Sequence, residues 1–174
     1  MWWRIDAEAP ELWSWAGFAE ARNRFDPETA TFRVRYAARS ATGAARERYL
    51  GTGRYIPSDH GSHHLVRLEA DRPLRILDLR TEANLDALGV DDRISTGRES
   101  QVWTASHRLA GRLRTWWSDL DGIIYRSRTT PASSVNLAFF ASTPFRAESR
   151  FLAHAPELLS ALVLDHGFTI GFDF

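Results

Sequence analysis

The sequence predicts an α+β fold, and three observations support that prediction. Several short segments alternate apolar and polar residues as half-buried strands do; in the clearest, at residues 32–36, three apolar side chains alternate with two arginines. Other segments have helical periodicity, the longest at residues 100–117 with its apolar side chains on or near one face. The chain has 174 residues, of which 44% are hydrophobic, and this is enough for a sizeable core. Because no repeat or linker interrupts it, we expect a single domain over residues 1–174.

The expected elements alternate along the chain. We expect strands at residues 2–5, 32–36, 64–69, 74–79, 123–125, 134–140 and 168–172. We expect helices at residues 44–50, 82–88, 100–117 and 151–164, with Pro156 interrupting the last one. Ser40, Thr42 and Gly43 are suited to a turn and a helix N-cap, and Gly89 to a helix end. The segment 10–20 fits either a helix or an aromatic-rich loop.

Composition excludes several classes of protein. The 22 basic residues, all of them arginine, balance 22 acidic residues, so no overall positive field marks a nucleic-acid-binding protein. The absence of cysteine excludes disulfides, iron–sulfur clusters and cysteine-ligated zinc. The N-terminal segment lacks the pattern of a signal peptide, and no apolar run reaches the ~18 residues of a membrane span. We therefore expect a cytoplasmic protein without a membrane partner.

Two further motifs point only weakly to a metal site or a phosphate-binding site. His60, His63 and His64 lie close together, but no carboxylate stands at the spacing of a metal-binding helix, and we expect a polar loop and no metal. The segment Gly51-Thr52-Gly53-Arg54 is similar to a phosphate-binding turn. It lacks the Gly-Lys-Ser/Thr ending of a P-loop and does not follow a strand.

Two stretches carry the residues best suited to a site. In residues 31–50, a strand with Tyr36 leads into a helix with Glu47; on their own, these side chains are typical of a core aromatic and a surface acid. In residues 121–128, an apolar strand ends in Tyr-Arg-Ser-Arg, which is either one wall of a pocket or a strand end flanked by solvated arginines.

Together these motifs resemble the RES-domain family. The resemblance rests on Arg24-Phe25-Asp26, on Tyr36 eleven residues before Glu47, on the segment 77–79 and on Asp121-Gly-Ile-Ile-Tyr-Arg-Ser, which occur in the family's order. It extends from about Arg4 to Phe140, and the best-known members of the family are the toxins of RES–Xre toxin–antitoxin modules. The chain departs from the family where Asn23 stands for a frequent glycine and Arg126 for a frequent proline.

The resemblance implies a mono-ADP-ribosyltransferase-like split β-sheet with flanking helices, with NAD bound as substrate. It implies cleavage of the nicotinamide–ribose bond by phosphorolysis or hydrolysis, or ADP-ribosyl transfer to a protein. It also implies an Xre-type helix-turn-helix antitoxin as partner. By position in the motifs, the catalytic residues are Glu47, Ser127 and Arg24, and the NAD-binding residues are Arg4, Arg24, Tyr36 and Ser127.

These residue types suit that reaction. Cleavage of the bond passes through an oxocarbenium-like transition state, which a fixed carboxylate such as Glu47 stabilises. Arg4 and Arg24 are suited to hydrogen bonds with the pyrophosphate. Tyr36 is suited to stacking on the nicotinamide ring, and Ser127 is suited to a hydrogen bond with a ribose hydroxyl. Water, phosphate and a protein acceptor remain open as nucleophile. The alternative is a non-enzymatic protein- or nucleic-acid-binding module on the same fold.

Overall fold

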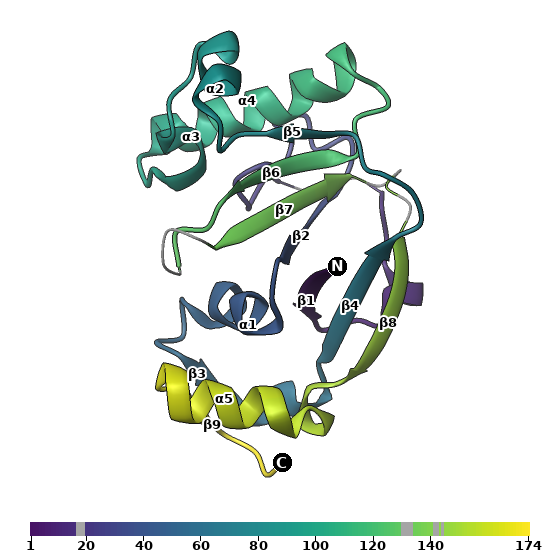
Figure 1. Ribbon diagram of the computed structural model, residues 1–174, viewed down its shortest axis with the longest axis vertical. Helices are drawn as coiled ribbons and strands as arrows, with labels where there is room; N and C mark the ends of the chain where they lie inside the picture. Colours follow the sequence, from purple (N-terminus) through teal and green to yellow (C-terminus); the bar gives the residue numbers. More distant parts are fainter. Residues whose placement is uncertain (17–19, 130–133, 141–142, 144) are drawn as a thin grey trace. The chain divides into compact units, whose positions relative to one another are not determined.

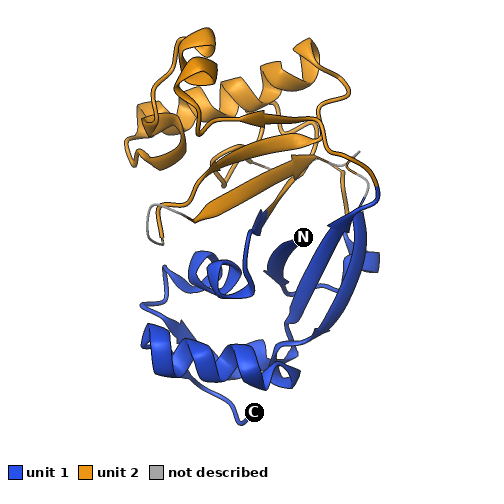
Figure 2. Cartoon of the chain, viewed as in Figure 1, with its two compact units in different colours: residues 1–13, 37–71, 145–174 blue, residues 14–36, 72–144 orange. Residues whose placement is uncertain are grey.

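The computed structural model describes residues 1–16, 20–129, 134–140, 143 and 145–174 (Figure 1). The chain divides into two compact units, each assembled from segments far apart in the sequence (Figure 2). Unit 1 comprises residues 1–13, 37–71 and 145–174, and unit 2 comprises residues 14–36 and 72–144. Strand β2 (Val34–Ala38) crosses the boundary, with its first three residues in unit 2 and its last two in unit 1.

Unit 1 combines antiparallel strands with two helices. Its further elements are β1 (Trp2–Asp6), a 3₁₀ turn (Pro10–Leu12), α1 (Ala41–Tyr49), β3 (Tyr55–Ile56), a 3₁₀ turn (Ser58–Ser62), β4 (His64–Ala70), β8 (Phe145–Phe151), a 3₁₀ turn (Leu152–His154), α5 (Pro156–His166) and β9 (Thr169–Ile170). Strand β4 pairs antiparallel with β1 on one side and with β8 on the other. The short strands β3 and β9 form a separate parallel pair.

Helix α1 is held in unit 1 at its start and along one face. Ser40 caps it, since its Oγ accepts a hydrogen bond of 3.0 Å from the amide of Gly43. Ala45 and Tyr49 are fully buried in a core that also contains Ile5 of β1 and Leu159 of α5. The cap thus stabilises the start of the helix, and its buried face fixes it to the unit.

Unit 2 combines a small sheet with helices on one side of it (Figure 1). Its further elements are β5 (Ile76–Asp78), α2 (Glu82–Leu88), α3 (Arg93–Thr96), α4 (Ser100–Trp116), β6 (Gly122–Arg126) and β7 (Val135–Phe140). Strand β6 runs parallel to β5 and antiparallel to β7. The parallel pair requires a long crossover, which α2, α3 and α4 provide. The core includes the fully buried Phe25, Leu113 and Phe140.

The expected α+β fold, with a split sheet and flanking helices, is confirmed, whereas some element boundaries were wrong. Strand β2 continues to Ala38, so Tyr36 lies at its centre and not near its end. Helix α1 begins at Ala41, which places Thr42 and Gly43 inside its first turn. Helix α5 begins at Pro156 because proline fits the first turn, where its missing amide hydrogen costs no hydrogen bond. The single domain over residues 1–174 stays a prediction.

Two strands were not expected from the sequence. Strand β8 has the polar sequence FRAESRF and is largely exposed, so it lacks the apolar face by which a strand is recognised. Strand β3 has only two residues. None of the described helices has the length and apolar character needed to cross a membrane.

Candidate functional site

Arg4 and Glu47 lie in unit 1. Arg4 stands in β1 opposite Val66, and its Nε donates a hydrogen bond of 2.6 Å to Oδ2 of Asp6. Its guanidinium carbon also lies 5.8 Å from the centre of a Trp13 ring. Because hydrogen bonds between ionised groups are short and strong, Asp6 orients the Arg4 side chain.

Glu47 lies in the last turn of α1 with its side chain exposed. On the buried face of the same helix, the hydroxyl of Tyr49 lies 3.3 Å from Nδ1 of His60. Burial raises the pKa of Tyr49 to about 12, so this hydroxyl stays protonated at neutral pH. Tyr49 and Ala45 thus fix the helix that carries the Glu47 carboxylate.

Tyr36 lies in unit 2, and its hydrogen bonds stabilise the turn that carries Arg24. Its hydroxyl accepts a hydrogen bond of 2.9 Å from the amide of Phe25 and donates one of 3.1 Å to Oδ1 of Asp26. The other oxygen of Asp26 accepts a hydrogen bond of 2.7 Å from the amide of Asn23. Burial, together with the charge of Asp26, raises the pKa of Tyr36 well above its usual value. Tyr36 is therefore a protonated donor that holds Asp26 in place.

Arg24 is buried and bound to the protein backbone. Its two terminal nitrogens donate hydrogen bonds of 3.1 Å to the carbonyl oxygen of Ile94 and 2.5 Å to that of Gly97. Its guanidinium carbon lies 5.1 Å from the centre of a Trp103 ring. Arg24 therefore connects the turn at residues 23–26 to the end of α3 and to α4.

Ser127 follows β6 directly and organises the next residues. Its buried Oγ accepts a hydrogen bond of 3.1 Å from the amide of Thr129 and lies 3.0 Å from the Thr129 hydroxyl. Its own amide donates to the carbonyl oxygen of Ser134, at 3.0 Å. The guanidinium carbon of the adjacent Arg128 lies 5.9 Å from the centre of a Trp103 ring.

The structure thus brings three of the expected site residues into one unit. In unit 2, Tyr36 and Arg24 meet through the turn at residues 23–26, and Arg24 meets the residue after Ser127 through Trp103. Sequence reasoning gave no role to Asp26 or Trp103. The signal for Asp26 was its place before Pro27, since aspartate in a turn often accepts backbone hydrogen bonds. Trp103, on or near the apolar face of the helix at residues 100–117, was expected in the core or on a partner-binding surface and not at this site.

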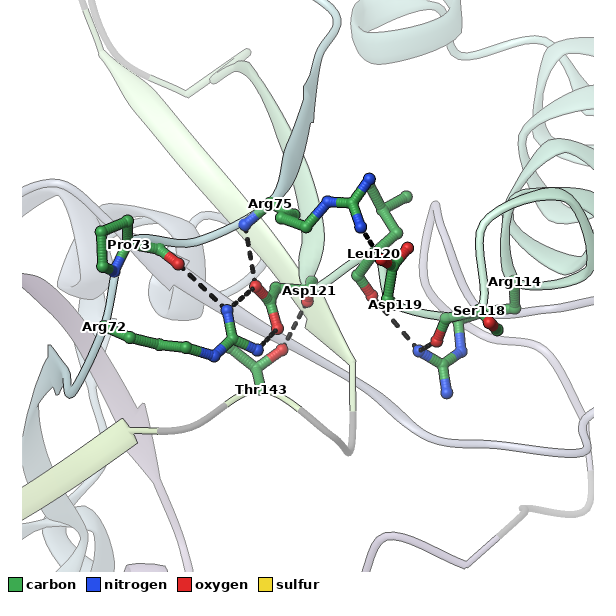
Figure 3. Close-up of polar contacts among 9 residues, drawn as sticks. All are labelled: Arg72, Pro73, Arg75, Arg114, Ser118, Asp119, Leu120, Asp121 and Thr143. Atoms are coloured by element: carbon green, nitrogen blue, oxygen red, sulfur yellow. Dashed lines mark hydrogen bonds and ion pairs between the residues drawn. The ribbon is translucent and has the colours of Figure 1, made fainter.

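The start of β6 is fixed by Asp121, the first residue of the motif that ends in Ser127 (Figure 3). Its buried carboxylate accepts hydrogen bonds of 2.7 and 2.9 Å from Arg72 and one of 2.8 Å from the amide of Arg75. Its carbonyl oxygen accepts hydrogen bonds from the Thr143 hydroxyl and the Phe140 amide. Asp121 therefore joins the starts of β5 and β6 to the end of β7.

His60, His63 and His64 lie just before and at the start of β4. The rings of His60 and His63 are stacked with their centres 3.8 Å apart, and burial lowers the pKa of His63. Among the residues that the structure describes, no group of three or more histidine, aspartate or glutamate side chains is arranged to hold a metal ion.

Comparison with known proteins assigns the chain to a family. The family model of the RES domain matches residues 1–159, so the chain belongs to the RES domain family. Among solved structures, a chain in the crystal structure of the M. tuberculosis MbcT–MbcA toxin–antitoxin complex has a similar fold. The TM-score is 0.62 at 18% sequence identity, and the match covers 91% of this chain and 88% of that chain. No match was found among curated proteins.

Proposed function

We propose that this RES-domain protein is a toxin that consumes NAD by cleaving its nicotinamide–ribose bond. The observation that carries the proposal is the family match over residues 1–159, which includes every residue that the motifs connect with NAD. The likeness to a chain of a toxin–antitoxin complex supports the toxin role. The reaction is NAD phosphorolysis, NAD hydrolysis or ADP-ribosyl transfer to a protein.

In this proposal the carboxylate of Glu47 stabilises the positive charge that develops on the ribose. An oxocarbenium-like transition state gains most from a fixed negative charge, and Glu47 projects from a helix anchored by Tyr49 and Ala45. Its exposure leaves room for a substrate and for an incoming water, phosphate or protein nucleophile. The nicotinamide departs as a neutral molecule, so the reaction needs neither a general acid nor a metal ion.

The remaining residues bind and orient NAD. Arg4 and Arg24 carry the charge for the pyrophosphate, and each is already oriented by hydrogen bonds within the protein. Tyr36 has an aromatic ring suited to the nicotinamide, and Ser127 offers a hydroxyl to a ribose. The contacts of Arg24 and Tyr36 with the turn at residues 23–26 give both residues a second, structural role.

A cytoplasmic Xre-type helix-turn-helix antitoxin is the proposed partner. The support is the similar fold of a chain that was solved as part of a toxin–antitoxin complex. A toxin that destroys NAD would need an inhibitor in the cell that makes it, and an antitoxin that covers the NAD site would serve this purpose.

The direct test is to incubate the purified protein with NAD, with and without phosphate, and to measure nicotinamide and the second product by liquid chromatography. We expect nicotinamide in stoichiometric amount with free ADP-ribose if water attacks, or with a phosphorylated ADP-ribose if phosphate does. A labelled protein in a lysate supplied with labelled NAD would identify a protein acceptor. If no nicotinamide appears under any of these conditions, the proposal is wrong.

A further inference from the structure

A shallow groove of about 450 Å³ runs along helix α4 in unit 2. One wall is a stripe of α4 residues from Gln101 to Trp116, which follow one another at spacings of one, three or four and so share one side of the helix. Leu88, the last residue of α2, and Val90, two residues later, also line the groove. At 1.5 Å per residue the stripe is about 22 Å long, the length of a helix of about fifteen residues.

The floor of the groove is apolar and one end is an exposed tryptophan. Leu88, Val90 and Leu109 supply the aliphatic surface. Trp116 lines the same groove and remains 51% exposed, which is unusual for so large an apolar side chain. Tryptophan is enriched among the residues that dominate binding energy at protein interfaces. These features are those of a binding surface for an apolar ligand.

The charge of the groove restricts the ligand further. Its lining includes Arg108 and Arg112 and no acidic residue. Arg108 lies 3.3 Å from Glu28, but both side chains are more than half exposed, and such a pair contributes little stability. Arg112 is also exposed. The groove therefore offers an apolar floor flanked by guanidinium groups.

We propose that this groove binds an amphipathic helix of a partner protein that carries carboxylates beside its apolar face. The partner's aliphatic side chains pack against Leu88, Leu109 and Trp116, and its carboxylates pair with Arg108 and Arg112. The length of the stripe favours a helix, which presents apolar residues at the same spacings of three and four. None of the proposed NAD-site residues lines the groove, so this proposal stands independently of the proposed function.

The probe is a designed helical 16-residue peptide with leucines along one face, glutamates beside them and a fluorescent label. A matched peptide has glutamine in place of every glutamate. We expect the acidic peptide to bind the full chain in fluorescence anisotropy, with its affinity weakened by salt and by the glutamine replacements. The variants Trp116→Ala and Arg112→Glu should each weaken binding by about tenfold or more.

Two exposed residues outside the groove provide controls. Leu164, 81% exposed on α5, and Arg98, on the loop before α4, do not line it, so Leu164→Ala and Arg98→Glu should bind the peptide as the unmodified chain does. Circular dichroism checks that every variant is folded. The proposal is overturned if neither peptide binds, or if both bind equally. It is also overturned if Trp116→Ala has no effect, or if sedimentation shows that the unmodified chain is a dimer that Trp116→Ala dissociates, since the groove is then filled by a second copy of this chain.

Discussion

The carboxylate of Asp121 and the guanidinium of Arg72 form a two-point ion pair, with N–O distances of 2.7 and 2.9 Å (Figure 3). The pair is asymmetric, because the Asp121 side chain is 2% exposed and that of Arg72 is 48% exposed. Two residues earlier, Asp119 pairs with Arg75 where both side chains are more than half exposed. Two aspartates only two positions apart thus each pair with an arginine, and the carboxylate is buried in one pair and exposed in the other.

We predict that Asp121→Ala lowers the free energy of unfolding by about 2–4 kcal/mol, because it leaves the Arg75 amide without its buried acceptor and removes the partner of Arg72. Asp119→Ala, which removes only an exposed pair, should change it by less than about 1 kcal/mol. Urea denaturation of the two variants measures the difference. Equal effects would show that Asp121 does not fix the start of β6.

We predict that Gly122→Ala destabilises unit 2 by about 1–3 kcal/mol. A Cβ at this position would collide with the carbonyl oxygen of Ala138 and would lie 3.0 Å from the Cα of Phe139, both on the neighbouring strand β7. Gly51→Ala is the matched control, since a Cβ there meets nothing within 4 Å. Thermal unfolding of both variants checks this, and a stable Gly122→Ala protein would contradict the close approach of β6 and β7.

We predict that Arg24→Lys lowers the free energy of unfolding by about 1–3 kcal/mol even without NAD. Lysine cannot reproduce the forked hydrogen bonds to Ile94 and Gly97, and one buried and one partly buried carbonyl group would each lose a donor. Arg98→Lys, at an exposed position nearby, should have no such effect. Denaturation in the absence of NAD separates this structural role from the proposed pyrophosphate contact, and unchanged stability would leave Arg24 with a ligand-binding role alone.

We predict that His63 makes the protein less stable in mild acid. Burial, aided by the positive charges of His60 and Arg48, lowers the pKa of His63 in the folded state below its ordinary value of 6.5. The unfolded chain therefore takes up the proton more readily, so this contribution to stability is complete above pH 6.5 and is lost as the pH falls through the lower, folded pKa.

The measurement is the midpoint of thermal unfolding as a function of pH for the unmodified chain and for His63→Asn. The decline below pH 6.5 should be smaller in His63→Asn, whereas His154→Asn, at an exposed position, should keep the steeper decline. Parallel curves for the unmodified chain and His63→Asn would show that His63 does not contribute.

The sequence predicted those elements whose side chains form a clear apolar face. Strand β6 and helix α4 were placed within one residue of their bounds, because the strand is a continuous buried apolar run and the buried residues of the helix share one side. Strand β8 was missed because its residues are exposed, and its existence depends on pairing with β4, a contact remote in sequence. Local pattern carries little information about such tertiary pairing.

The candidate site shows the same limit. From the resemblance to RES-domain motifs we inferred five site residues, Arg4, Arg24, Tyr36, Glu47 and Ser127. Their roles in binding and cleaving NAD stay predictions. What the sequence could not give is the set of contacts that hold these residues. The bond from Tyr36 to Asp26 spans ten residues, and the contacts of Arg24 with Gly97 and Trp103 span more than seventy. Contacts between residues so far apart in the sequence become visible only in the three-dimensional structure.

In the proposed function, Glu47 supports cleavage of NAD. The most direct measurement is the rate of nicotinamide release by the unmodified chain, by Glu47→Gln and by the control Glu157→Gln, which alters an exposed acid on α5 in the same unit. We predict that Glu47→Gln slows release by about 10²–10³-fold, since removing one fixed group that stabilises a developing charge has effects of this size. Glu157→Gln should keep the full rate. Equal rates for the unmodified chain and Glu47→Gln, with both folded, would show that Glu47 has no part in the reaction.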